Sequence, residues 1–77
     1  MPTVLLVNGF RFYFYMNEHL PVHIHVTKAG GRAKFILLPE IELTFSQGFK
    51  IKEIREIINI ITDNHDYLIQ KWYETFN

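Results

Sequence analysis

Residues 3–15 read TVLLVNGFRFYFY, and this stretch determines how the fold begins. Two apolar and aromatic runs flank the dipeptide Asn8-Gly9. A two-residue type I′ turn requires positive φ at both central positions, which Asn followed by Gly adopts most readily. The sequence therefore predicts an antiparallel hairpin whose second strand buries a row of phenylalanines. Alternation places three side chains on the opposite face of that strand: Arg11, Tyr13 and Tyr15.

Two or three further strands follow, separated by turns that contain glycine or proline. Residues 22–28 alternate as a strand, the turn 29–31 reverses the chain, and residues 33–38 form the next strand. After a turn at 39–40, residues 41–46 alternate apolar with polar side chains, which fits a fifth strand or an extended loop. The predicted sheet is an antiparallel meander of four or five strands.

Beyond Gly48 the apolar period changes from two to about three and a half, which predicts helix. Residues 62–64 are Thr-Asp-Asn, three poor helix formers, and Asn64 suits a helix N-cap. We therefore expect either one helix kinked near Asn64 or two helices, covering one face of the sheet. The predicted fold class is α+β, in a single domain over residues 1–77. The apolar helical positions are Ile51, Ile54, Ile58, Ile61, Leu68, Trp72 and Phe76.

Size and charge narrow the class of protein. The chain has 77 residues and no cysteine, so neither disulfides nor thiolate metal ligands support the core. It contains no secretory leader and no apolar run long enough to span a bilayer, so we expect a soluble cytoplasmic protein. Residues 1–38 carry four Lys or Arg against one Glu, whereas residues 39–77 carry four against seven acidic residues. This asymmetry permits an anionic ligand on the first half.

Residues 21–26, PVHIHV, place His23 and His25 on one face of a strand, opposite the face that the helices cover. They join the hairpin's Arg11, Tyr13 and Tyr15, and Lys34 of the following strand, in a patch without acidic residues. Tyrosine, histidine and basic side chains suit stacking on bases and contacting phosphates. The alternative is an ordinary solvated sheet face. The predicted binding residues are Arg11, Tyr13, Tyr15, His23, His25 and Lys34.

Three other hypotheses concern the same histidines. His23 and His25 could be the acid–base pair of a metal-independent ribonuclease, with Lys34 stabilising the phosphoryl transition state. His19, His23 and His25 could hold a divalent metal, but no specific metal-site signature is present, so we predict no cofactor. A homodimer without catalysis, in which the histidines border the interface, is the third. The sequence leaves open whether the protein is an enzyme.

The motifs MPTVLLVNGFRFYFY, PVHIHV, AKFILLP, QGF and KWYETF together resemble domain of unknown function 4160, a family of small bacterial proteins. The resemblance covers nearly the whole chain, and the family pattern includes His23, His25 and Lys34 but not His19. Members are commonly encoded beside a second small protein, which implies a toxin–antitoxin-like two-gene module with that protein as partner. We therefore expect a small cytoplasmic component of such a module that binds RNA or a partner protein through the open sheet face around His23 and His25.

Overall fold

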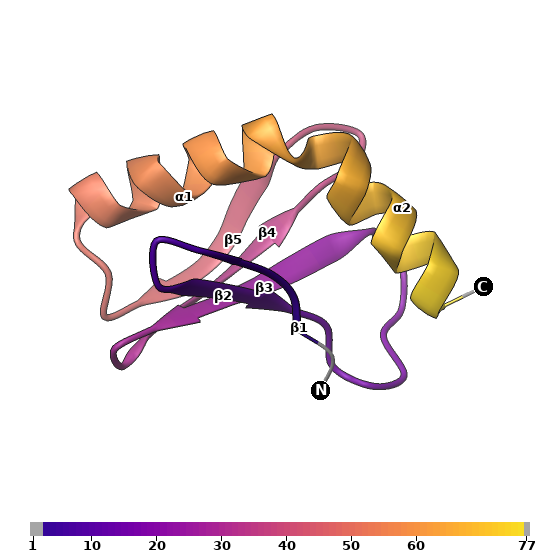
Figure 1. The fold of residues 1–77 in the computed structure, drawn as a ribbon, viewed down its shortest axis with the longest axis horizontal. Helices are drawn as coiled ribbons and strands as arrows, with labels where there is room; N and C mark the ends of the chain where they lie inside the picture. The colour runs from indigo at the N-terminus through magenta and orange to yellow at the C-terminus, as the bar shows by residue number, and fades with distance from the viewer. Residues whose placement is uncertain (1–2, 77) are drawn as a thin grey trace.

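The computed structural model describes residues 3–76, which form an antiparallel sheet and two helices (Figure 1). The sheet has the strand order β1-β2-β3-β4-β5, so every strand pairs with its neighbours in sequence. The predicted α+β fold is confirmed, and residues 42–47 join the sheet as its fifth strand. Residues 1, 2 and 77 of the predicted domain lie outside the described residues. The elements are β1 (Thr3–Val7), β2 (Phe10–Tyr13), β3 (His23–Lys28), β4 (Gly31–Ile36), β5 (Glu42–Gln47), α1 (Ile51–Asp63) and α2 (His65–Thr75).

Two turns of the same kind shape the sheet. Asn8 and Gly9 have φ of 53° and 81°, the positive values that a type I′ turn requires, and they join β1 to β2 as predicted. Ala29 and Gly30 have φ of 47° and 87° and join β3 to β4. The sequence predicts that Gly31 belongs to this turn. In the structure Gly31 instead pairs with Lys28 and begins β4.

The glycine at position 31 leaves room for an aromatic ring. A Cβ atom built on Gly31 would lie 2.5 Å from Cε1 of Phe49, so no larger residue fits while that ring is in place. The Phe49 ring in turn packs against Phe10, with centroids 5.9 Å apart. The Phe49 ring, two residues before α1, therefore packs against both Gly31 of β4 and Phe10 of β2.

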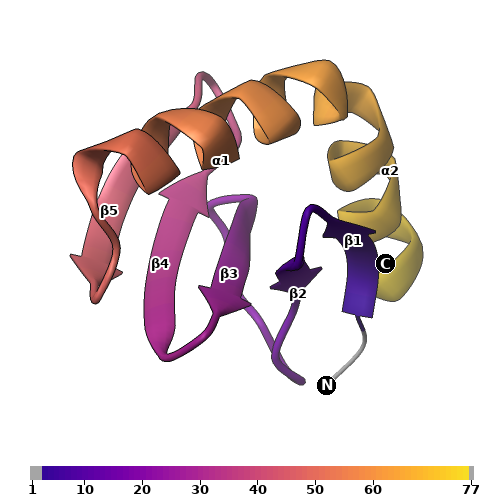
Figure 2. The ribbon, with the colours of Figure 1, turned by 60° about the vertical axis from the view of Figure 1, so that its left-hand side comes forward.

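The two helices cross one face of the sheet and leave the other face uncovered by helix (Figures 1 and 2). The predicted covered face is confirmed, since each of its apolar residues is at most 3% exposed. Ile51 does not follow the prediction and is 74% exposed, because it starts α1 and the buried part of that helix begins at Ile57. The buried side chains of the covered face are Phe10, Phe12, Phe14, Val22, Ile24, Val26, Ala33, Phe35 and Leu37, and those of the helices are Ile57, Ile60, Ile61, Leu68 and Trp72.

The helical segment breaks at Asn64, as expected, but Asn64 caps the end of the first helix and not the start of the second. Its side-chain Nδ2 donates to the carbonyl of Ile60 at 2.8 Å, so the amide caps the C-terminus of α1 and not the N-terminus of α2. The carbonyl of Asn64 accepts from the N–H of Leu68 at 2.9 Å, which continues the chain into α2. The bend lets α2 lay Trp72 against Phe14, with ring centroids 5.4 Å apart.

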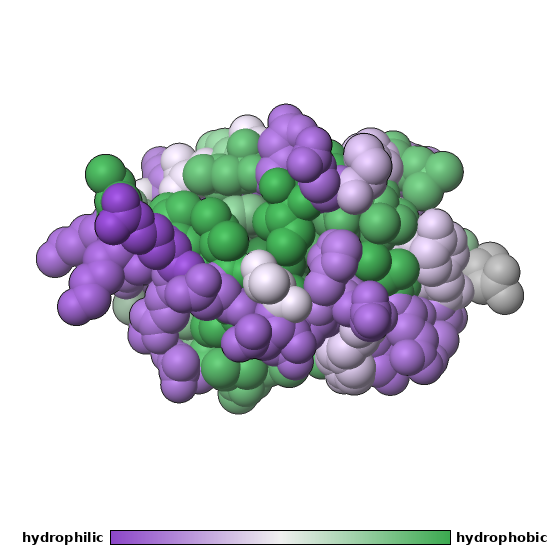
Figure 3. Space-filling view, turned by 90° about the horizontal axis from the view of Figure 1, so that it is seen from above, coloured by the Kyte–Doolittle hydropathy of each residue, from purple (hydrophilic) through white to green (hydrophobic). Residues whose placement is uncertain are grey.

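Some apolar residues that pack against the core are only partly buried. Seen from the helical side, a band of hydrophobic side chains runs between hydrophilic ones (Figure 3). Neither helix within residues 3–76 has the length and apolar content needed to cross a membrane. The partly buried apolar residues are Val4, Leu5, Val7, Leu38, Ile41, Phe49, Ile54, Ile58, Ile69 and Phe76.

Replacing Gly31 with alanine tests the packing of Phe49. The added methyl group would collide with the ring, so we expect Gly31→Ala to lower the free energy of unfolding by about 1–3 kcal/mol, the usual cost of overpacking. Urea denaturation measures this loss. In a Phe49→Ala background the space is free, and the same glycine substitution should cost less. Equal losses in both backgrounds would contradict the proposed contact.

Candidate functional site

Cross-strand pairing assembles the predicted site residues in a row on the open face. Tyr13 pairs with His25, His25 with Lys34, and Lys34 with Phe45, so four strands each contribute one side chain. Residues directly opposite each other in an antiparallel sheet project from the same face. The next row on this face contains Arg11, Thr27, Arg32 and Gln47.

The first row lines an open hollow of about 200 Å³, which we call the cationic hollow. Aromatic rings and two cations surround it, and no carboxylate from the described residues contributes to its lining. Tyr15 and Phe45 are 42% and 46% exposed, so two of these rings present area to solvent. The lining residues are Tyr13, Tyr15, His25, Arg32, Ala33, Lys34 and Phe45.

Tyr13 lines the hollow and contacts Arg11 of the next row. The guanidinium of Arg11 lies 4.5 Å from the centre of the Tyr13 ring, and its Nε donates to Thr3 Oγ1 at 2.6 Å. Burial, followed by the hydrogen bond and charge of Tyr15, raises the pKa of Tyr13 to about 12, although the charge of Arg11 acts in the opposite direction. The Tyr13 side chain is therefore buried and neutral at physiological pH, and it does not act as a proton acceptor.

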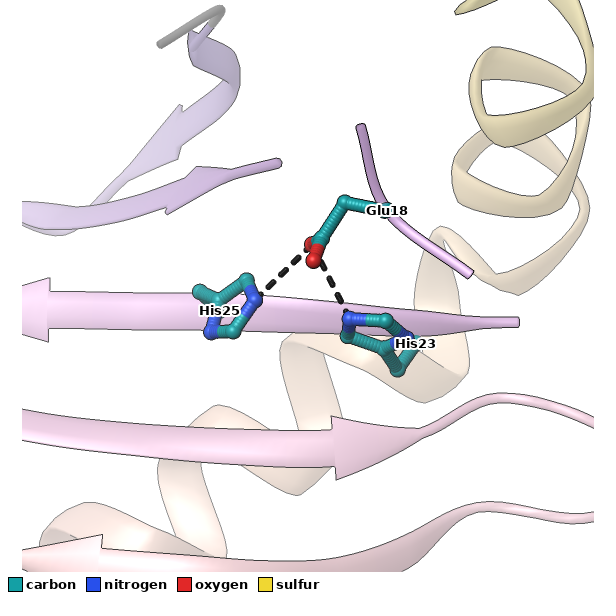
Figure 4. Close-up of side chains that lie close together, drawn as sticks. All are labelled: Glu18, His23 and His25. Carbon is teal, nitrogen blue, oxygen red and sulfur yellow. Dashed lines mark hydrogen bonds and ion pairs between the residues drawn. The ribbon is translucent and has the colours of Figure 1, made fainter. Parts of the chain in front are cut away.

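The loop from residue 14 to residue 22 carries Glu18 onto both histidines (Figure 4). One carboxylate oxygen, Oε2, lies 2.9 Å from Nε2 of His23 and 2.9 Å from Nε2 of His25. The three side chains are only 11%, 5% and 15% exposed, in the order Glu18, His23 and His25. The open face therefore contains a nearly buried polar cluster beside the cationic hollow. We call these three residues the Glu-His-His cluster.

His23 is more enclosed than the sequence predicts. We expected both imidazoles to face outward, but His23 is 4% exposed, because the Glu18 loop and Trp72 of α2 cover its ring. Its Nδ1 lies 2.8 Å from the carbonyl oxygen of Pro21, and a carbonyl only accepts, so Nδ1 carries a proton. Both nitrogens of His23 thus contact protein oxygens.

His25 belongs to both the Glu-His-His cluster and the cationic hollow. Its ring stacks on Tyr13 at a centroid distance of 5.5 Å and meets Tyr15 edge-on at 4.4 Å. Burial lowers the pKa of His25 below its ordinary value, Glu18 opposes this shift, and the charges of His23 and Lys34 add to it. His25 is therefore neutral at pH 7, with a lone pair available on one ring nitrogen.

Residues 9–73 match the model of the family described as Domain of unknown function (DUF4160). The chain belongs to this family. The match confirms the resemblance seen in the sequence, and it includes every residue of the cationic hollow and of the Glu-His-His cluster. No curated protein and no solved structure shows a significant match to the chain.

In this DUF4160 domain the structure brings together most of the predicted site residues. Tyr13, Tyr15, His25 and Lys34 line the hollow, whereas Arg11 lies one row away and His23 lies in the cluster. His19, a candidate metal ligand, is exposed and lies outside the cluster found within residues 3–76, where Glu18 takes that place.

Four residues of the site were not among the predicted site residues: Glu18, Arg32, Ala33 and Phe45. Arg32 lies two residues before Lys34, so alternation would have found it had the strand been started one residue earlier. Phe45 pairs with Lys34, but an irregularity follows and Leu43 pairs with Phe35, so alternation along this strand does not predict the face of Phe45. No periodicity connects Glu18 to the histidines, because a loop separates them.

Removing the Glu18 carboxylate should destabilise the DUF4160 domain. Glu18→Ala leaves two nearly buried imidazoles without their carboxylate partner, and we expect a loss of about 1–3 kcal/mol in the free energy of unfolding. Urea denaturation in the presence of EDTA measures the loss without a contribution from metal ions. Glu40→Ala, which removes an exposed carboxylate, is the matched control and should change little. Identical midpoints for the two variants would show that the cluster does not hold the loop.

Proposed function

We propose that this protein binds single-stranded RNA through the cationic hollow on the open face of its sheet. The observation that carries the proposal is the lining of the hollow, in which exposed Tyr15 and Phe45 flank the cations of Arg32 and Lys34. No carboxylate of the described residues lines it. Unpaired bases stack on exposed aromatic rings while their phosphates bind basic side chains, and sheet faces with exposed aromatics accommodate two or three bases in this way.

The distribution of charge supports an anionic ligand on this face. The chain is neutral overall, and the two helices, which form the other layer of the molecule, carry five acidic residues against Lys52, Arg55 and Lys71 (Figure 2). Glu18, the acidic residue beside the hollow, is engaged by two histidines. The Lys34 ammonium forms no ion pair within residues 3–76. The resulting field favours approach of a polyanion to the sheet side.

The proposed biological setting is a two-gene module of toxin–antitoxin type in the bacterial cytoplasm. The resemblance to small proteins encoded beside a second small protein supports this setting. The neighbour-encoded protein is then the proposed protein partner, and it would regulate RNA binding by covering the same face. Leu6 is 68% exposed and pairs with Arg11, so this face also offers apolar surface to a protein.

The ribonuclease hypothesis has weaker geometric support. General acid–base catalysis requires each catalytic nitrogen to lie within hydrogen-bond reach of the substrate. Both nitrogens of His23 contact Glu18 or Pro21, and its side chain is 5% exposed. His25 and Lys34 line the hollow, but His23 does not, so the two histidines do not face one substrate there. We therefore propose binding, and not cleavage, as the activity of this face.

The charge of Lys34 can be tested by the salt dependence of RNA binding. Fluorescence anisotropy with a labelled single strand of about 10 nucleotides gives the dissociation constant at several salt concentrations. Lys34→Gln should weaken binding and reduce the slope of log affinity against log salt by about 0.7, the value for one phosphate contact on a single strand. Lys52→Gln, an exposed lysine of α1, is the matched control and should leave the slope unchanged. Equal slopes in all three proteins would remove the hollow as the RNA site.

The stacking role of Phe45 gives a different signature. Phe45→Ala should weaken RNA binding by about 1–3 kcal/mol, the value of one stacked base, with little change in the salt slope. The same anisotropy titration measures both quantities. Tyr73→Ala removes an exposed aromatic ring from α2 and is the matched control. If wild-type protein binds no RNA while the neighbour-encoded protein co-purifies with it and is lost in Phe45→Ala, the hollow is a protein-binding surface instead.

A further inference from the structure

If both histidines were neutral, the cluster would not have a proton for each of its short contacts. Nδ1 of His23 donates its proton to the carbonyl of Pro21. A neutral imidazole has a single N–H, so Nε2 of His23 then presents a lone pair. That lone pair lies 2.9 Å from a carboxylate oxygen of Glu18, which also presents lone pairs. A positive centre must therefore lie between the two residues, either a proton or a metal ion.

The geometry of the donors is compatible with a metal ion. Both imidazoles approach the same oxygen of Glu18, and the donor atoms of the three residues lie within 4.8 Å of one another (Figure 4). Donors that lie about 2.0–2.2 Å from a first-row ion are about 3 Å apart when they occupy adjacent positions. The distances of 2.9 Å from Oε2 to each Nε2 match this spacing. An N–H···O hydrogen bond has the same length, so what points to an ion is that the Nε2 atom of His23 converges on this oxygen while its proton is held on Nδ1.

We propose that Glu18, His23 and His25 form a three-donor site for a divalent first-row transition ion such as Zn²⁺. Two imidazoles and one carboxylate are the donor set of mononuclear zinc and non-haem iron sites, which keep further positions for water or a ligand. The bond from His23 Nδ1 to Pro21 is the outer contact that such histidines commonly make, since it fixes the tautomer and directs Nε2 to the metal. The site goes beyond RNA binding and does not depend on it.

The charge and position of the cluster fit a dication. In the form that can bind a metal, with Nε2 of both imidazoles unprotonated and Glu18 ionised, the cluster carries a net charge of −1, and all three side chains are at most 15% exposed. A buried charge of this kind needs a compensating partner, which a bound ion supplies. Because His25 also lines the cationic hollow, the ion lies at the edge of that hollow, where an anionic oxygen can complete its coordination.

Titration of untagged, EDTA-treated protein with Zn²⁺, followed by calorimetry, tests the site. We expect one ion per chain and a higher melting temperature with the ion bound. Glu18→Gln and His25→Ala should each weaken binding by more than about 100-fold, since loss of an outer contact alone costs about 10–100-fold. His19→Ala removes an exposed histidine next to Glu18 and is the matched control, which should bind as the wild type does.

A second measurement uses the wild-type protein and does not depend on the folding of a variant. Addition of Zn²⁺ should shift the NMR signals of Nε2 in His23 and His25, while the ring signals of His19 and His65 stay in place. No Zn²⁺ binding tighter than about 1 mM would overturn the proposal and leave a proton between the residues. Stoichiometric binding without a shift of the two Nε2 signals, or equal loss of affinity in His19→Ala, would also overturn it.

Discussion

Burial of one phenylalanine row constrains everything else in this molecule. Phe10, Phe12 and Phe14 are completely buried, and each contributes about 1.5–3 kcal/mol relative to exposure. A shift of one residue in the strand register would expose all three and lose several kcal/mol. The register in turn holds Arg11 and Tyr13 on the opposite face. The core and the candidate site are therefore two consequences of the same alternation.

The loop between β2 and β3 encloses the part of that open face that holds His23 and His25. Without the loop, the two histidines would border solvent, as the sequence suggests. The loop places the Glu18 carboxylate on both rings, and α2 places Trp72 against His23. Burial of these polar groups is unfavourable unless they are paired, so the loop position and the pairing stabilise each other.

Two neighbouring features on this face have opposite electrostatic preferences. The cationic hollow suits the proposed anionic strand, whereas the Glu-His-His cluster suits the proposed cation. His25 belongs to both, because its ring lines the hollow while its Nε2 contacts Glu18. A cation held in the cluster would add positive charge at the edge of the hollow and strengthen its attraction for phosphate. The two proposals therefore reinforce each other, although each rests on its own contacts.

Local sequence determined the parts of the protein that depend on near neighbours. The Asn8-Gly9 hairpin, the phenylalanine face and the break at Asn64 each follow from turn chemistry, alternation or helix propensity over a few residues. The shared face of His23 and His25 follows from alternation in the same way. Most of the fold and four residues of the hollow could be predicted for this reason.

Only the tertiary structure decided which side chains meet across loops and between layers. The contact of Glu18 with the histidines depends on the path of an irregular loop, and the burial of His23 depends on a tryptophan 49 positions later in the chain. Phe45 lines the hollow because it pairs with Lys34, while an irregularity in the pairing of β4 with β5 puts Leu43 opposite Phe35. No periodic pattern encodes such contacts, because they arise from packing of the whole chain and not from the geometry of one element.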